Sequence, residues 1–215
     1  MARRVELSED QRRTLDRLRP PSERLGLYLA GGTAIAIHLG HRTSRDLDLF
    51  SRAPDLDLER ARSSLVELEN SEVTSISDAT LALRIDGVPV DVVRYPYPLL
   101  NPTSPGPGTF PIASLEDLAT MKLSATARRG IRRDFWDLYE IFQCGSVTLP
   151  GTLASYSRRF GVKESDLYHV IRSLTFFDDA EADSLMPDGL TEEKWAEIRN
   201  WFLDEAPKTL ASALE

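Results

Sequence analysis

In the first half of the chain, short runs of apolar residues alternate with polar segments typical of turns. The run LGLYLA, from Leu25 to Ala30, has the length and composition of a buried strand. DLDLF, from Asp46 to Phe50, alternates polar and apolar residues with the period of a strand. Further strand-like segments are 73–77, 81–85 and 88–95. The Asp86-Gly87 pair between the last two predicts a tight hairpin. This half is therefore expected to form a β-sheet.

Helical patterns flank these strands. Ser8 and Gln11 have the spacing of a capping box, which predicts a helix over Ser8–Leu18 that ends at Pro20-Pro21. A second helix is expected over Thr33–Leu39, after the two glycines that close the first strand. A third is expected over Asp55–Glu69, with Asp55 or Asp57 as its N-cap.

The pattern changes after Asn101–Pro111, where four prolines and two glycines in eleven residues indicate a linker or a long irregular loop. Helical patterns then follow at 114–127, 132–143, 153–160, 164–176 and 192–204. The expected fold class is α+β. We expect a mixed sheet with flanking helices over residues 1–110 and a helical domain over residues 111–215, which contributes to a nucleotide cleft.

Composition and charge narrow the function classes. A net charge of −8 does not suit broad, sequence-blind binding to nucleic acid, which depends on neutralising phosphates. Arg128, Arg129, Arg132 and Arg133 make a local basic run, but on charge alone it is better explained as a solvated helix face. The single cysteine cannot form an internal disulfide, and we find neither a membrane-length apolar stretch nor a secretory signal. We therefore expect a cytoplasmic protein that does not bind membranes.

Asp46 and Asp48 carry the strongest chemical signal. Residues i and i+2 of a strand point to the same face, roughly 6–7 Å apart. Two carboxylates placed in this way form half of a Mg²⁺ site, because hard cations prefer oxygen ligands. Asp55-Leu56-Asp57 has the same spacing, but there it is expected to serve only as a helix cap.

The segment Gly31-Gly32-Thr33 follows the predicted strand that precedes Asp46 and Asp48, and a helix is expected to begin there. Glycines let a backbone approach a phosphate closely, and a helix N-terminus offers free N–H groups. A plain strand-to-helix turn is an equally good explanation of this segment alone. The P-loop and Rossmann patterns are both absent.

Asp91 lies inside the apolar segment Val90–Val93. A buried acid is costly unless it is paired or bound to a metal, although an acid at a strand end can simply face solvent. If this strand lies beside Asp46 and Asp48, three carboxylates converge and two Mg²⁺ ions can be held.

Two segments resemble a known family. The run GGTAIAIHLGHRTSRDLDLF, with Gly31, Gly32, Thr33, Arg42, Ser44, Asp46 and Asp48 at its defining positions, resembles the first motif of the AbiEii/AbiGii toxin-type nucleotidyltransferases. These belong to the polymerase-β-like superfamily. DLATMKLSATARRGIRRDFWDLYEI resembles the helical motif of that family, and SLTFFDDAEADSLMP resembles a stretch near its C-terminal end.

The resemblance implies a polymerase-β-like core and assigns roles to individual residues. Asp46, Asp48 and Asp91 become catalytic metal ligands for Mg²⁺, with two ions expected and Mn²⁺ as an alternative. The implied nucleotide-binding residues are Gly31, Gly32, Thr33, Arg45, Lys122, Arg129, Asp134 and Asp137. Arg129 and Arg133 share a face if their helix is continuous, and Arg133 is a further member of the helical motif.

The resemblance also implies a function and its partners. We expect transfer of a nucleoside monophosphate from a nucleoside triphosphate to a hydroxyl of tRNA or protein, in a toxin whose antitoxin is encoded nearby. One alternative is a small-molecule nucleotidyltransferase of the aminoglycoside-modifying kind, since an acidic surface suits a cationic substrate. The other alternative is a degenerate module that only binds nucleotide.

Overall fold

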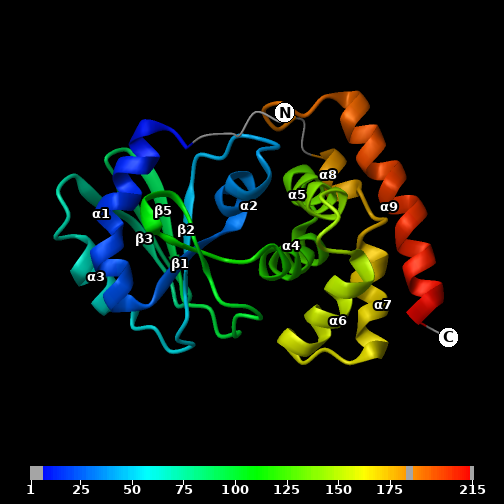
Figure 1. Cartoon of the computed structure of the whole chain (residues 1–215), viewed down its shortest axis with the longest axis horizontal. Helices are drawn as coiled ribbons and strands as arrows, with labels where there is room; N and C mark the ends of the chain where they lie inside the picture. Colours follow the sequence, from blue (N-terminus) through cyan, green and yellow to red (C-terminus); the bar gives the residue numbers. More distant parts are fainter. Residues whose placement is uncertain (1–6, 183–185, 214–215) are drawn as a thin grey trace. The chain divides into compact units, whose positions relative to one another are not determined.

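The structure is a computed structural model that describes residues 7–182 and 186–213. Its packing divides the chain into two compact units, Met1–Ser114 and Leu115–Glu215. The first unit holds a β-sheet with helices, and the second is helical (Figure 1). The α+β fold class expected from the sequence is thereby confirmed.

The sheet of the first unit has seven strands within the described residues, in the order β3-β4-β5-β2-β1-β7-β6. The strands are β1 (Leu27–Ala30), β2 (Leu47–Ser51), β3 (Ser71–Ile76), β4 (Thr80–Ile85), β5 (Val88–Val93), β6 (Ser104–Pro105) and β7 (Pro111–Ile112). β2 runs antiparallel to β1 and parallel to β5. The predicted hairpin joins β4 to β5, with positive φ angles at both Asp86 and Gly87.

One row of the sheet forms the core of this unit. Leu81, Val92, Leu49 and Leu29 are register partners across four adjacent strands, and each is 0 % exposed. The neighbouring row, offset by one residue, contains Ala82, Asp91, Asp48 and Ala30. Because successive residues of a strand face opposite sides, this second row lies on the other face of the sheet. The apolar row anchors the strands that present the acids.

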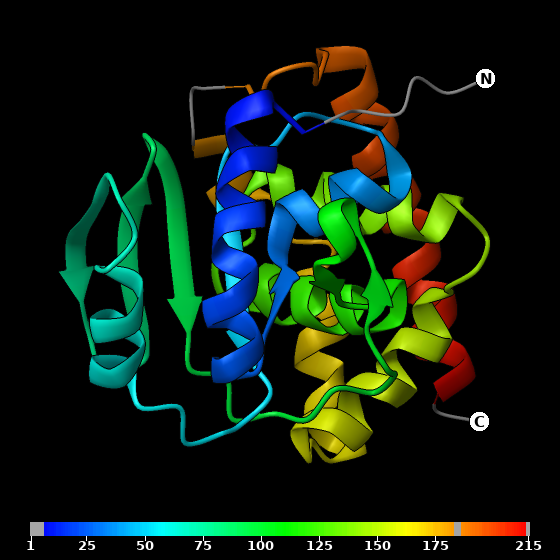
Figure 2. The same ribbon diagram turned by 60° about the vertical axis from the view of Figure 1, so that its left-hand side comes forward.

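The helices of the first unit are α1 (Glu9–Leu25), α2 (Gly31–Leu39), α3 (Leu58–Leu65) and the short 3₁₀ turn η1 (Pro107–Thr109). α1 contacts β1, β5 and α3, and α3 also contacts β4 (Figure 2). The capping box predicted for α1 is present, and Asp57 caps α3.

The prediction that Pro20-Pro21 ends the first helix was wrong. α1 continues to Leu25 and ends in the left-handed Gly26. Each proline removes one backbone hydrogen bond, but packing on the sheet compensates for that loss. Leu18, Pro21 and Leu25 are all buried on one side of the helix.

The segment 101–111 is not a structureless linker. β6 and β7 pair with each other, and β7 adds to β1 through Leu29 and Ile112. Two of the four prolines lie in these strands: Pro105 is in the edge strand β6, and Pro111 is the first residue of β7. A missing N–H is tolerated at both kinds of position.

The second unit is built from α4 (Leu115–Arg129), α5 (Arg132–Gln143), α6 (Leu149–Phe160), α7 (Glu164–Ser173), α8 (Asp178–Ala182) and α9 (Glu192–Ala213). Its aromatic core centres on Phe135, whose ring lies 5.0–5.9 Å from those of Phe177, Trp195 and Phe202. None of the helices in the described ranges is long and apolar enough to span a membrane.

Candidate active site

Asp48 and Asp91 lie side by side in the sheet. They are register partners on the parallel strands β2 and β5, whose spacing is about 4.8 Å. Asp46 immediately precedes β2, two residues before Asp48. Burial and the negative charge of Asp46 together raise the pKa of Asp91 above its ordinary value. The three predicted acids therefore lie in one region of the sheet, where the charge of Asp46 acts on Asp91.

This arrangement suits a divalent cation in its donor chemistry. Carboxylate oxygens are the ligands that Mg²⁺ and Mn²⁺ take, and a cation relieves the repulsion that raises the pKa of Asp91. Within residues 7–182 and 186–213, however, no group of three or more His, Cys, Asp or Glu side chains is close enough to form a ready-made metal cluster. The three carboxylates would therefore have to rearrange to share an ion.

The glycine turn at the start of α2 packs directly on Asp48. Gly31 has φ +65°, a left-handed conformation that favours glycine. A Cβ placed on Gly31 would lie 1.9 Å from Oδ2 of Asp48. Both the backbone angle and the lack of space for a side chain therefore require glycine at position 31. The Asp48 carboxylate lies against the turn that the family resemblance assigns to triphosphate binding.

A buried arginine lies behind the same turn. Arg42 is 8 % exposed, and a Cβ on Gly32 would lie 2.4 Å from its Nη2. Its Nη1 donates to the carbonyl oxygen of Thr43 at 2.9 Å. Arg42, a member of the first motif, thus packs against Gly32 in the segment that leads to the acids.

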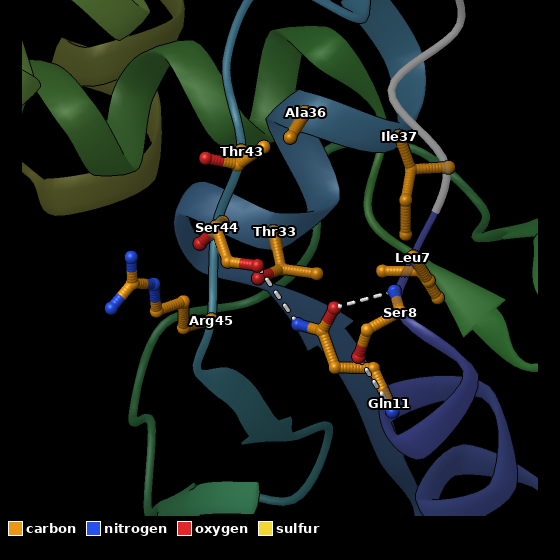
Figure 3. A pocket seen from close by; sticks show the side chains of 9 residues that line it. All are labelled: Leu7, Ser8, Gln11, Thr33, Ala36, Ile37, Thr43, Ser44 and Arg45. Atoms are coloured by element: carbon orange, nitrogen blue, oxygen red, sulfur yellow. Dashed lines mark hydrogen bonds between the residues drawn. The ribbon is translucent and has the colours of Figure 1, made fainter. Parts of the chain in front are cut away.

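The remaining residues predicted in the first unit lie around this segment (Figure 3). The hydroxyl of Thr33 donates to the carbonyl oxygen of Asp46, so α2 is tied to the backbone that leads into β2. Arg45 is exposed, and its side chain extends away from Thr33 and Ser44.

The predicted cationic residues of the second unit form an ion-pair cluster. Nζ of Lys122 lies 2.9 Å from Oδ1 of Asp134 and 2.9 Å from Oδ2 of Asp137. Arg129 donates to Asp134 through both Nε, at 2.8 Å, and Nη2, at 3.1 Å. We call these four residues, Lys122, Arg129, Asp134 and Asp137, the α4–α5 ion cluster. Both carboxylates are 0 % exposed.

Burial alone would raise the pKa of Asp134, but Lys122 and Arg129 outweigh it and hold that pKa below its ordinary value. Burial likewise opposes the charge of Lys122, yet Asp137 and Asp134 raise its pKa above the ordinary value. The charges of both groups are therefore favoured at neutral pH.

The condition under which Arg129 and Arg133 would share one helix face, a continuous helix, is not met. α4 ends at Arg129, Gly130 takes φ +47°, and α5 begins at Arg132. This break lets Arg129 fold back onto Asp134. The structure thus groups the three acids with the glycine turn in one unit and the ion cluster in the other. The nucleotide-binding roles of both groups remain predictions.

Comparison with known proteins identifies the family. The family model described as "Nucleotidyl transferase AbiEii toxin, Type IV TA system" matches residues 13–215. The chain belongs to the AbiEii toxin family of nucleotidyltransferases. It is also 30 % identical over 198 residues to an uncharacterized protein of Aquifex aeolicus, covering 91 % of this chain and 94 % of that one.

Solved structures support the fold of this AbiEii family member. MenT4, a nucleotidyltransferase toxin from Mycobacterium tuberculosis, matches with TM-score 0.57 and 15 % identity over 98 % of this chain and 90 % of that one. The antibiotic-resistance factor ANT(2'')-Ia matches with TM-score 0.53 and 15 % identity over 75 % of this chain and 96 % of that one. The expected nucleotidyltransferase fold and enzyme class are confirmed.

Replacing Gly31 by alanine should damage the site beyond the cost of its backbone angle. The new Cβ must displace the Asp48 carboxylate, so we expect transfer activity to fall by about 100-fold, the usual effect of a misplacement of about 1 Å. Gly161→Ala is the matched control, because Gly161 also has φ +65° but nothing lies within 4 Å of the position that its Cβ would take. Equal activity in the two variants would show that the contact with Asp48 is unimportant.

Asp91→Asn should stabilise the metal-free protein while removing its response to metal. A carboxyl whose folded pKa is raised contributes stability below its ordinary pKa and loses it as pH rises through the folded value. At pH 7 the neutral amide should therefore slow hydrogen exchange in β2 and β5. Asp55→Asn, from the other Asp-x-Asp pair, should change neither property. Faster exchange in metal-free Asp91→Asn would contradict the repulsion between Asp46 and Asp91.

Asp134→Asn should destabilise the second unit at neutral pH by about 3 kcal/mol, because it removes one charge of a buried ion-pair cluster. The folded pKa of Asp134 is lowered, so its contribution is present above the ordinary value of about 4 and is lost as pH falls through the folded value. The difference in unfolding free energy between Asp134→Asn and wild type should therefore become smaller as the pH is lowered.

Tryptophan fluorescence measures this effect selectively, because Trp136, Trp195 and Trp201 all lie in the second unit. The exposed pair of Asp204 and Lys208 in α9 of the same unit provides the control, since Asp204→Asn should leave the transition almost unchanged. If the stability difference between Asp134→Asn and wild type stayed constant down to pH 2, the ionised carboxylate of Asp134 would not be the group that stabilises the second unit.

Proposed function

We propose that this AbiEii family member transfers a nucleoside monophosphate from a nucleoside triphosphate to an acceptor hydroxyl and releases pyrophosphate. The observation that carries the proposal is the pairing of Asp48 and Asp91 on adjacent parallel strands, with Asp48 packed against the glycine turn of α2. Carboxylates, a divalent cation and a phosphate-binding turn are the parts that phosphoryl transfer needs.

In this proposal Asp46 and Asp48 hold two Mg²⁺ ions, and Asp91 holds one of them. When bound, the ions would neutralise the phosphates and lower the pKa of the attacking hydroxyl. The raised pKa of Asp91 suits its second proposed role, which is to accept the proton of that hydroxyl. The protein itself would contribute mainly position and electrostatic stabilisation.

The proposed triphosphate site is the start of α2. Gly31 and Gly32 have no side chains of their own to block a phosphate, and the N-terminus of the helix presents backbone N–H groups to an anion. Lys122 is the proposed additional phosphate ligand. Two of its three N–H donors are engaged by Asp134 and Asp137, which would fix the direction of the third.

As a toxin of a type IV system, the protein would act on tRNA or on a protein and would be opposed by an antitoxin encoded nearby. The family match supports the toxin assignment, and the acceptor class is our proposal. Modification of a small cationic molecule is the second candidate function. The net charge of −8 favours it, because an acidic protein attracts cations.

A label-transfer assay tests these proposals. Purified protein, Mg²⁺ and each α-labelled nucleoside triphosphate would be incubated with total tRNA, with cell protein and with a panel of aminoglycosides. We expect label on one acceptor class, with pyrophosphate released in equal amount, and a loss of at least about 100-fold in Asp46→Asn.

Asp57→Asn is the matched control, because Asp57 caps α3 and lies outside the acidic site. Label that persists in Asp46→Asn would refute the catalytic assignment. Nucleotide binding without transfer to any of the three classes would favour the degenerate nucleotide-binding module.

A further inference from the structure

Gln11 is a buried polar residue whose side chain has two separate tasks. It is 5 % exposed and lies in the first turn of α1. Its Oε1 accepts a hydrogen bond from the backbone N–H of Ser8 at 3.0 Å, which completes the capping box. Its Nε2 donates to the carbonyl oxygen of Ser44 at 2.9 Å, 33 residues further along the chain. Gln11 also precedes the segment matched by the family model, which begins at residue 13.

The bond to Ser44 holds the backbone just before the acids. Ser44 is two residues before Asp46, whose own carbonyl oxygen accepts the hydroxyl of Thr33. Two side-chain donors, one from α1 and one from α2, therefore hold alternate carbonyl groups of the segment 44–46. Figure 3 shows the bond from Gln11 to Ser44. We call this pair of hydrogen bonds the carbonyl clamp.

The carbonyl clamp borders a cavity. A cavity of about 210 Å³ is lined by both donors, by Ser44 and Arg45, and by apolar side chains that include Leu7 and Ile37. A segment that borders such a space has fewer packing contacts on that side. The two hydrogen bonds therefore help to fix its position, and with it the position of the first acid.

The choice of glutamine also points to the clamp. A capping box accepts glutamate or glutamine at its third helical position, because only a side-chain oxygen is required. Glutamate would complete the same box, but it has no N–H for the Ser44 carbonyl. The second task of residue 11 is the one that requires an amide.

We propose that Gln11 is a positioning residue for the acidic site. Through Ser44 it fixes the backbone from which Asp46 and Asp48 extend, and so it sets how readily these acids join Asp91 on a divalent cation. The inference rests on the proposed metal-dependent function. It adds the start of α1, outside the family match, to the machinery of the site.

Three variants separate the clamp from the helix cap. Gln11→Glu keeps an oxygen for the Ser8 N–H and loses the donor to Ser44. Gln11→Met keeps the approximate volume and loses both bonds. Ser8→Ala is the converse control, because it removes the hydroxyl that caps Gln11 N–H but leaves the Ser8 backbone and the Ser44 contact in place.

The primary measurement is Mn²⁺ binding followed by electron paramagnetic resonance, which needs no catalysis. We expect both Gln11 variants to bind Mn²⁺ about tenfold more weakly, the lower range for loss of a group that orients metal ligands. Their amides at 44–48 should exchange hydrogen faster. Ser8→Ala should lower the melting temperature while leaving Mn²⁺ affinity unchanged. The added charge of Gln11→Glu would by itself strengthen cation binding, so weaker binding cannot be attributed to charge.

Asp48→Asn separates this inference from the proposed function. If Asp48→Asn loses Mn²⁺ but both Gln11 variants bind it like wild type, the positioning role is refuted and the metal site stands. If Ser8→Ala weakens Mn²⁺ binding as much as Gln11→Glu does, the effect comes from the helix cap and the inference is again overturned. If wild type does not bind Mn²⁺, the proposed function fails together with the inference that rests on it.

Discussion

The pairing of two like charges on adjacent parallel strands is the constraint on which the first unit depends. Asp48 and Asp91 occupy the same row of the sheet, and strands alone would not favour that arrangement. The neighbouring row offsets this unfavourable pairing, because Leu29, Leu49 and Val92 are fully buried and their burial fixes the register of the strands. A slip of one residue would move the apolar row to the other face and remove the acids from the site. Burial of the apolar row thus maintains the pairing of the two carboxylates.

The parts around the acids are constrained by contact as well as by charge. Gly31 must be glycine because its backbone is left-handed and the Asp48 carboxylate occupies the space of a side chain. A side chain on Gly32 would meet the terminal Nη2 of Arg42, which would have to shift. Gln11 and Thr33 hold the backbone that enters β2. These residues come from separate segments, so the site is a product of tertiary structure and not of the Asp-x-Asp motif alone.

Local patterns predicted the parts of this fold that are set by neighbouring residues. Alternation identified β2, the Asp86-Gly87 pair identified the hairpin, and Ser8 with Gln11 identified the start of α1. The errors came where distant contacts override local preference. Packing on the sheet carries α1 through its two prolines, and pairing with β1 draws the proline-rich segment into the sheet edge.

The same limit applies to the site. Spacing placed Asp46 and Asp48 on one face, but no local signal revealed which strand lies next to them. Nor could the sequence show that Gln11 contacts Ser44, because a capping box accepts glutamine or glutamate at that position whether or not a second contact exists. The break at Gly130 was visible as a glycine, but its effect, which is to turn Arg129 toward Asp134, depends on the fold.

The α4–α5 ion cluster shows why a motif rich in cations need not act through net charge. Lys122 and Arg129 carry two positive charges, and Asp134 and Asp137 carry two negative ones, so the cluster is formally neutral. Its long-range attraction for a triphosphate is therefore weak compared with that of a lone lysine. What the two carboxylates provide is direction, because they fix the Lys122 ammonium between them at 2.9 Å each. A phosphate ligand built in this way would favour one geometry over others, which is what an in-line transfer demands of groups that contact its transition state.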